Sequence, residues 1–123
     1  MVNQPSVLVI DDDEAIRTLV DMALSQEGFT VLTATNYATA LELLRDHEPR
    51  LILLDTGPGE LVGQTFIQAY RQTPGPHVPV LVFSAGWNLA DHAARIGADG
   101  YLPKPFELET LFEVVQKYAA PEL

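Results

Sequence analysis

Leu51-Ile52-Leu53-Leu54-Asp55 is an unbroken apolar run that ends at a carboxylate. Two other apolar runs stop at polar groups in the same way: Val7–Ile10 before three aspartates, and Val80–Phe83 before Ser84. A shorter segment, Tyr101-Leu102, ends two residues before a lysine. Apolar runs without alternation are typical of strands buried on both faces, as in a parallel sheet. Because ligands of such sheets bind beyond the carboxyl ends of the strands, we expect these polar groups to gather at one edge.

The rest of the chain alternates between such runs and amphipathic segments. Apolar residues at helical spacing predict five helices, and runs bounded by turn-forming residues predict five strands. The predicted strands are Ser6–Ile10, Thr30–Ala34, Leu51–Leu54, Val80–Phe83 and Gly100–Leu102. The predicted helices are Asp13–Glu27, Tyr37–His47, Gly63–Thr73, Leu89–Ile96 and Glu107–Tyr118. Five strands alternating with five helices predict an α/β domain with a doubly wound five-stranded parallel sheet.

Helical spacing also predicts which side chains the helices bury. In the first helix these are Ile16, Leu19, Val20, Ala23 and Leu24, and in the last Leu108, Leu111, Phe112 and Val115. Gly28 stands where the first helix needs a C-terminal cap. The fourth helix is short and poor in apolar residues.

Composition restricts the class of protein. A chain of 123 residues has room for one sheet and its covering helices, so we expect residues 1–123 to form a single domain with no output domain. The formal net charge of −10, with no basic cluster, argues against direct nucleic-acid binding. The absence of cysteine excludes disulfides and thiolate chemistry. No apolar run is long enough to cross a bilayer, so we expect a cytoplasmic protein without membrane contact.

Three consecutive aspartates follow the first strand. One aspartate at such a junction is most often a helix cap, and we assign that role to Asp13. Three exceed what capping needs, and each close pair repels by about 1 kcal/mol even at water-like screening. A bound cation would relieve that repulsion. Oxygen ligands without histidine or cysteine indicate Mg²⁺ or Mn²⁺, held by Asp11 and Asp12.

Asp55 would be a weak signal by itself, because aspartate often ends a strand. Beside a metal ion, one of its carboxylate oxygens can be oriented while the other attacks a phosphorus centre. The backbone carbonyl of Gly57 can serve as a further metal ligand.

Lys104 and Ser84 follow the other two strands of this edge. Lys104 is either a surface lysine or a fixed ammonium that pairs with Asp55 at rest and with phosphoryl oxygens afterwards. Ser84 is either a turn residue or a hydroxyl donor to a phosphoryl oxygen. The histidines, His47, His77 and His92, share no metal-ligand spacing, and we expect each at the surface.

Four segments together resemble the receiver domains of two-component response regulators, over essentially the whole chain. They are Val7–Asp13, Leu51–Asp55 with Gly63 downstream, Ser84-Ala85, and Gly97–Phe106. The first three are moderate signals and the last, Gly-Ala-Asp-Gly-Tyr-Leu-Pro-Lys-Pro-Phe, is strong. Found together in this order and at this spacing, the four segments are very specific for that family. The resemblance implies a flavodoxin-like fold of the receiver type.

The resemblance implies that Asp55 is the phosphoacceptor, in a Mg²⁺-dependent reaction. The phosphoryl group would come from a phosphohistidine on a sensor histidine kinase or a histidine phosphotransfer protein. Asp11, Asp12, Asp55 and the carbonyl of Gly57 would hold Mg²⁺. Such a domain is not an enzyme in the usual sense, although it promotes its own phosphoryl transfer and dephosphorylation.

The same resemblance implies a switch with a downstream protein target. Ser84 and Lys104 would bind the phosphoryl oxygens, and the bond between Lys104 and Pro105 would be cis. Tyr101 resembles the switch aromatic, whose ring fills the space that Ser84 vacates when it moves. The face made by the fourth helix, fifth strand and last helix would then change its affinity for the target. The other interpretation of Tyr101 is a half-buried strand aromatic.

Several positions depart from the family pattern. Pro58 stands one position early in the loop after Asp55, which affects the backbone near the metal. Gly57 and Gly86 replace larger side chains that influence water access to the phosphoryl group. The stretch from Ser84 to Gly97 is slightly short, so we expect an atypical output face. Arg50 replaces a common acidic residue, with no consequence that we can derive.

Three alternatives remain open. A phosphohydrolase with an aspartyl nucleophile would fit the Asp-x-Asp pattern but normally needs a longer chain and a second acidic pair. A flavin-binding module would require a phosphate-binding loop after the first strand. This chain has three aspartates there, and they would repel the phosphate. A receiver-like interaction module that is never phosphorylated is disfavoured by the complete set of acidic, hydroxyl and lysine residues.

Overall fold

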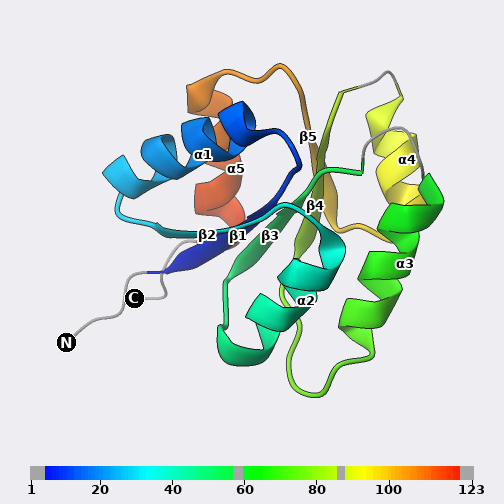
Figure 1. Ribbon diagram of the computed structural model, residues 1–123. Helices are drawn as coiled ribbons and strands as arrows, with labels where there is room; N and C mark the ends of the chain where they lie inside the picture. Colours follow the sequence, from blue (N-terminus) through cyan, green and yellow to red (C-terminus); the bar gives the residue numbers. More distant parts are fainter. Residues whose placement is uncertain (1–4, 57–59, 86–87, 120–123) are drawn as a thin grey trace.

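The chain folds into five strands and five helices that alternate along the sequence (Figure 1). The computed structural model describes residues 5–56, 60–85 and 88–119, and side chains from residue 63 onward in the third helix. The strands are β1 (Ser6–Ile10), β2 (Thr30–Ala34), β3 (Leu51–Leu54), β4 (Val80–Ser84) and β5 (Gly100–Pro103). The helices are α1 (Glu14–Gln26), α2 (Tyr37–Asp46), α3 (Glu60–Arg71), α4 (Leu89–Ile96) and α5 (Leu108–Ala119).

The strands form one parallel sheet in the order β2-β1-β3-β4-β5. The strand order reverses between β1 and β3, so these two neighbours lead to opposite halves of the sheet. Ile10 pairs with Leu54, and the N–H of Asp55 donates to the carbonyl of Ile10 at 2.8 Å. The residues that follow β1 and β3 therefore emerge side by side at the carboxyl edge, which is where α/β sheets bind ligands.

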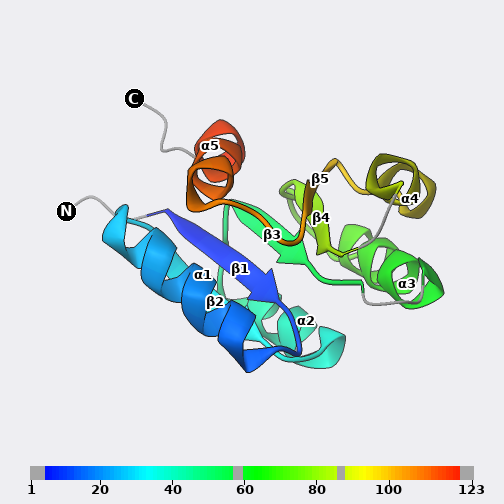
Figure 2. The ribbon, with the colours of Figure 1, turned by 90° about the horizontal axis from the view of Figure 1, so that it is seen from above.

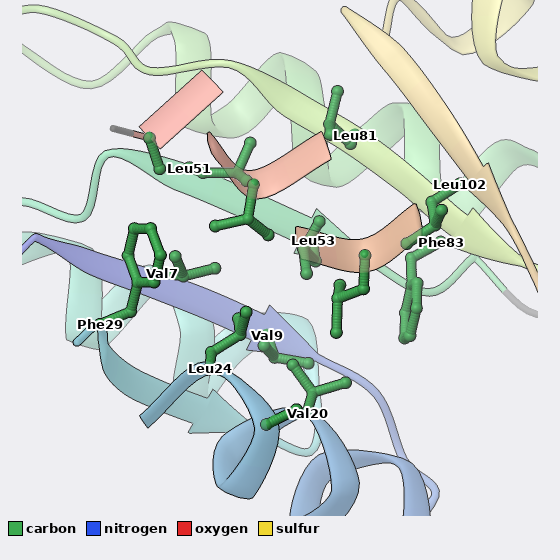
Figure 3. Close-up of a cluster of buried hydrophobic side chains, with 14 residues drawn as sticks. Val7, Val9, Val20, Leu24, Phe29, Leu51, Leu53, Leu81, Phe83 and Leu102 are labelled. Atoms are coloured by element: carbon green, nitrogen blue, oxygen red, sulfur yellow. The ribbon is translucent and has the colours of Figure 1, made fainter. Parts of the chain in front are cut away.

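Helices cover both faces of the sheet, as the view from above shows (Figure 2). α1 and α5 lie on one face, and α2, α3 and α4 on the other. β1, β3 and β4 are buried on both faces, because alternate residues enter two separate clusters. Figure 3 shows the cluster under α1 and α5, where Val9 lies close to Val20 and Leu24 and Val7 lies close to Phe29, while Leu51 and Leu53 follow the neighbouring strand β3. The continuous apolar runs of the sequence are explained by this double burial.

The predicted fold is confirmed, every predicted element is present, and the bounds of α1, α2 and α5 differ from the predicted ones by one residue at one or both ends. β1, β2, β3 and α4 have the predicted bounds, and β4 and β5 each extend one residue further. α3 begins at Glu60 rather than at the predicted Gly63, and it ends at Arg71 rather than at Thr73. Glycine weakens a helical signal, yet this helical position leaves no room for a larger residue, because a Cβ atom on Gly63 would lie 2.7 Å from Cγ2 of Thr56.

The prediction of burial is wrong for two residues. Leu19 in α1 is 43% exposed, and Leu108 in α5 is 42% exposed. The buried stripe of α1 runs through Val20, Ala23 and Leu24, which leaves Leu19 on its flank. Leu108 is the first residue of its helix, one turn before the sheet covers that face. Gly28 has φ of +90° directly after the C-cap of α1, which confirms the predicted stop signal.

The α4 helix packs on the rest of the domain through few apolar side chains, as its composition predicted. Its buried side chains are Leu89, Ala93 and Ile96, at a spacing of one residue per helical turn. Within the described part of the chain, no helix combines the length and the hydrophobicity needed to cross a membrane.

Candidate functional site

Three carboxylates meet at the carboxyl edge of β1 and β3. Asp11, Asp12 and Asp55 each offer an oxygen atom within 4.8 Å of the other two. Asp11 is only 2% exposed, Asp12 is exposed, and Asp55 lies between these extremes. Such a cluster of hard oxygen atoms, partly open to solvent, has the donor set that Mg²⁺ or Mn²⁺ prefers.

Asp11 is the buried anchor of this cluster. Its Oδ1 accepts the N–H of Asp13 at 2.9 Å, and its Oδ2 accepts the ammonium group of Lys104. Its backbone carbonyl accepts Nη1 of Arg17, in α1, at 2.8 Å. These contacts satisfy a carboxylate that would otherwise be costly to bury. They also fix the backbone that presents Asp12.

Asp13 has the capping role that the sequence predicted. Its Oδ1 accepts the N–H of Ala15 at 2.9 Å, and its backbone is extended at the start of α1. The side chain that caps the helix is thereby separated from the cluster of Asp11, Asp12 and Asp55.

Lys104 is a partly buried residue of the site and not a surface lysine. Its Nζ lies 3.7 Å from Oδ1 of Asp55 and pairs more closely with Asp11. It also lies 4.6 Å from the ring centroid of Phe83, whose ring packs on Phe106. The bond between Lys104 and Pro105 is cis. The expected contact with Asp55 is present, and the stronger contact with Asp11 is a feature that the sequence did not predict.

Ser84 and Tyr101 lie on adjacent strands of the same region. Ser84 is buried at the end of β4, where its hydroxyl donates to the carbonyl of Ala85 at 3.3 Å. Tyr101 pairs with Val82 in the sheet, and its side chain is 48% exposed. Tyr101 is thus about half exposed in this structure. Gly57, Pro58 and Gly86, on which other predictions depend, lie outside the described residues.

The sequence analysis missed Tyr37, the first residue of α2. Its hydroxyl donates to the backbone carbonyl of Asp55 at 2.9 Å, and its ring packs on Phe66 at 5.2 Å between centroids. Burial, followed by the negative charges of Asp55 and Asp12, raises the pKa of Tyr37 to about 12. The available signal was its position, because the start of α2 follows β2 at the same carboxyl edge.

The surface prediction for the histidines is wrong for His92. His47 and His77 are exposed, but His92, in α4, is partly buried. Its Nε2 lies 2.9 Å from Oγ1 of Thr56, the residue directly after Asp55. α4 covers this end of the sheet, so a residue of its first turn reaches the loop that follows the candidate acceptor.

Comparison with known proteins agrees with this geometry. Residues 7–116 match the family described as the response regulator receiver domain. The response regulator MprA of Mycobacterium ulcerans is 38% identical over 107 residues, which are 85% of this chain and 46% of that protein. The chain therefore spans about half the length of the curated relatives it matches.

Solved structures give the same result. A response regulator from Thermotoga maritima superposes with a TM-score of 0.81 at 31% identity, covering 94% of this chain and 98% of the other. NtrX from Brucella abortus superposes with a TM-score of 0.77 at 30% identity, covering 94% of this chain and 26% of NtrX. With the match over residues 7–116 and the acidic cluster at the sheet edge, these similarities show that the chain belongs to the receiver domain family of response regulators.

Proposed function

We propose that this receiver domain accepts a phosphoryl group on Asp55, in a Mg²⁺-dependent reaction with a phosphohistidine donor. The observation that carries this proposal is the convergence of Asp11, Asp12 and Asp55 with Lys104 at one sheet edge. A carboxylate nucleophile, an acidic metal site and a fixed ammonium group are the parts that phosphoryl transfer to an aspartate needs.

Mg²⁺ fits the donor set of the site. We assign its ligands to Asp11, Asp12, Asp55 and the backbone carbonyl of Gly57. Bound there, the ion would neutralise charge on the transferring phosphoryl group and on the carboxylates. The N–H of Asp13 donates to Oδ1 of Asp11 at 2.9 Å, and this contact would keep the exposed Asp12 in position to bind the ion.

In the proposed transfer, one carboxylate oxygen of Asp55 forms a bond to phosphorus. The phosphorus–nitrogen bond of the donor breaks, and the imidazole leaves with the bonding electron pair. Lys104, already 3.7 Å from Asp55, would donate to a phosphoryl oxygen. The added group carries roughly −1.5 to −2 charges, so its attraction for the ammonium group is strong.

The proposed switch uses Ser84 and Tyr101. The hydroxyl of Ser84 makes a long contact, 3.3 Å, with the carbonyl of Ala85. It would rotate to donate to a phosphoryl oxygen, and the ring of Tyr101 would turn inward from its exposed position. The phosphoryl group biases this equilibrium because it binds the hydroxyl in only one of the two arrangements.

The partners follow from this chemistry. We propose a sensor histidine kinase or a histidine phosphotransfer protein as donor and a protein as downstream target, in the cytoplasm. Residues 1–123 would act as one receiver unit that promotes its own phosphorylation and dephosphorylation. The net charge of −10 opposes direct binding of nucleic acid by this domain.

Intact mass after incubation with acetyl phosphate, with and without Mg²⁺, tests the proposal. We expect a Mg²⁺-dependent phosphoryl adduct on the wild type and none on Asp55→Asn. Asp13→Asn is the matched control, because asparagine also caps a helix and Asp13 is outside the acidic cluster. It should label like the wild type.

Two results would contradict the proposal. Undiminished labelling of Asp55→Asn would place the acceptor elsewhere. No adduct on the wild type, even with a cognate phosphohistidine donor, would favour an interaction module that is not phosphorylated. Fluorescence of the single tryptophan, Trp87, would report in the same samples whether Mg²⁺ binds near Ser84.

A further inference from the structure

Thr56 is one of the few buried polar side chains of the described residues, and it directly follows Asp55. Its side chain is 6% exposed. Its Oγ1 forms a hydrogen bond of 2.9 Å with Nε2 of His92, which lies 36 positions later, in α4. Either tautomer of the histidine permits this bond, because the hydroxyl of Thr56 can both donate and accept.

The methyl group of Thr56 is confined as well. A Cβ atom placed on Gly63, in α3, would lie 2.7 Å from Cγ2 of Thr56 and 3.5 Å from Cδ1 of Ile96, in α4. Only glycine leaves room for Thr56 at this point. The side chain is therefore held by its hydroxyl at α4 and by its methyl group at α3. Because threonine is branched at Cβ, it has little freedom to rotate away from both contacts.

The peptide group between Asp55 and Thr56 is thus held from two flanks. On one flank, Tyr37 of α2 donates to the carbonyl of Asp55 at 2.9 Å. On the other, His92 of α4 binds the side chain of Thr56. A change in the backbone at Asp55 must therefore move α4, or stretch the bond between Thr56 and His92.

We propose that Thr56 and His92 are positioning residues that couple the phosphorylation of Asp55 to the position of α4. This inference rests on the proposed function, since it needs a phosphoryl group on Asp55. The connection is separate from the one through Ser84 and Tyr101, which lie on β4 and β5. A hydrogen bond that differs in strength between the two states of Asp55 supplies the differential free energy that coupling requires.

A purely structural role is the competing explanation. In that case the bond fastens α4 to the sheet equally in both states, and its loss lowers stability without changing the response. The measurable difference is the ratio of the hydrogen-exchange rates of α4 with and without the phosphoryl adduct. If the bond couples the two sites, this ratio differs between the wild type and variants that lack the bond, at equal occupancy of Asp55. If the bond is purely structural, the ratio is the same.

The experiment uses the full chain and two pairs of variants. Thr56→Val removes the hydroxyl and keeps the shape, whereas Thr56→Ser keeps the hydroxyl. His92→Asn cannot place a polar atom where Nε2 lies, whereas His92→Gln can. Acetyl phosphate and Mg²⁺ load Asp55, intact mass gives the occupancy, and hydrogen–deuterium exchange follows the peptide that covers Leu89–Ile96.

We expect the adduct to change exchange in α4 of the wild type. In Thr56→Val and His92→Asn this change should shrink by roughly three- to tenfold, the range for loss of one hydrogen bond. Thr56→Ser and His92→Gln should largely retain it. The double variant should be no worse than either single variant, because both remove the same bond.

His77→Asn is the matched control, because His77 also contacts a threonine, Thr73, but at the opposite edge of the sheet. An unchanged α4 response in both Thr56→Val and His92→Asn, at full occupancy, would overturn the inference and leave the proposed function standing. No adduct on any form of the protein would overturn the proposed function, and this inference with it.

Discussion

The ammonium group of Lys104 pairs more closely with Asp11 than with Asp55, although Lys104 and Asp11 are 93 positions apart in the sequence. Asp11 is the more buried of the two acids, so it has the greater need of a compensating charge. Lys104 therefore has a role in the resting fold as well as in the proposed chemistry.

Lys104→Ala should destabilise the metal-free domain. Removing the lysine leaves the buried charge of Asp11 without its cation, which costs roughly 1–3 kcal/mol for a partly buried pair. Mg²⁺ should still bind and recover part of this loss. Denaturant unfolding with and without Mg²⁺ measures both effects. Lys117→Ala is the control, since Lys117 lies over the ring of Tyr118, in α5, away from the acidic cluster. An equal loss in both variants would argue against the pairing.

The same variant should impair the response to phosphorylation. Without the ammonium group, a phosphoryl group on Asp55 loses a cationic donor that lies 3.7 Å from this carboxylate at rest. We expect the adduct-induced change in the environment of the Tyr101 ring, followed by NMR, to be strongly reduced at equal occupancy. A response like that of the wild type would show that Lys104 serves the resting fold alone.

Tyr37→Phe should change how stability depends on alkaline pH. The pKa of Tyr37 rises from 10.0 to about 12 in the folded chain because burial and nearby carboxylates disfavour the phenolate. The raised pKa contributes stability that is complete below pH 10.0 and is lost as pH rises through about 12.

Unfolding free energies across this alkaline range provide the check. The wild type should lose stability more steeply than Tyr37→Phe, and Tyr118→Phe serves as the control. Tyrosinate absorbance should also lose a step near pH 12 in Tyr37→Phe. Parallel stability curves for the wild type and Tyr37→Phe would contradict the assignment.

Gly63→Ala should destabilise the fold in a way that Thr56→Ser reverses. The added methyl group would lie 2.7 Å from Cγ2 of Thr56, and overpacking of this kind costs about 1–3 kcal/mol. Serine lacks Cγ2, and the next atom, Cβ of residue 56, is at an acceptable 3.4 Å. Thermal unfolding of the two single variants and the double variant gives the coupling free energy between positions 56 and 63. Strictly additive effects would show that the clash is relieved elsewhere.

Mg²⁺ should stabilise the wild-type domain and have little effect on Asp12→Asn. At a concentration about tenfold above its dissociation constant, a ligand of the folded state adds ~1.4 kcal/mol. Asp12 is the exposed member of the cluster, so its replacement removes a ligand with little disturbance of packing. Asp13→Asn should respond to Mg²⁺ like the wild type. Equal stabilisation of Asp12→Asn would remove Asp12 from the set of ligands.

The fold was largely predictable from sequence, because the three strands that are buried on both faces, β1, β3 and β4, are continuous apolar runs. Each run has the predicted bounds or ends one residue later, and each leads to a residue of the site. Predictions failed where burial depends on what a neighbouring element covers. Leu19 and Leu108 follow helical spacing but lie at the flank or the end of a buried stripe.

The site was predictable only in the residues that follow strand ends. Asp11, Asp12, Asp55 and Lys104 follow β1, β3 and β5, and the parallel sheet brings them together. Tyr37 and His92 were missed because their contacts join helices to a loop, 18 and 36 positions apart in the sequence. No local pattern encodes such a contact, since it depends on how a helix is seated on the sheet.

The pairing of Ile10 with Leu54 ties the chemistry of the chain to its integrity. Asp11 and Asp55 come from distant parts of the sequence and are neighbours only while β1 and β3 are paired. A chain that loses this pairing keeps its aspartates but loses the acidic cluster. Under the proposed function, an incompletely folded copy should therefore neither bind Mg²⁺ at this edge nor accept a phosphoryl group.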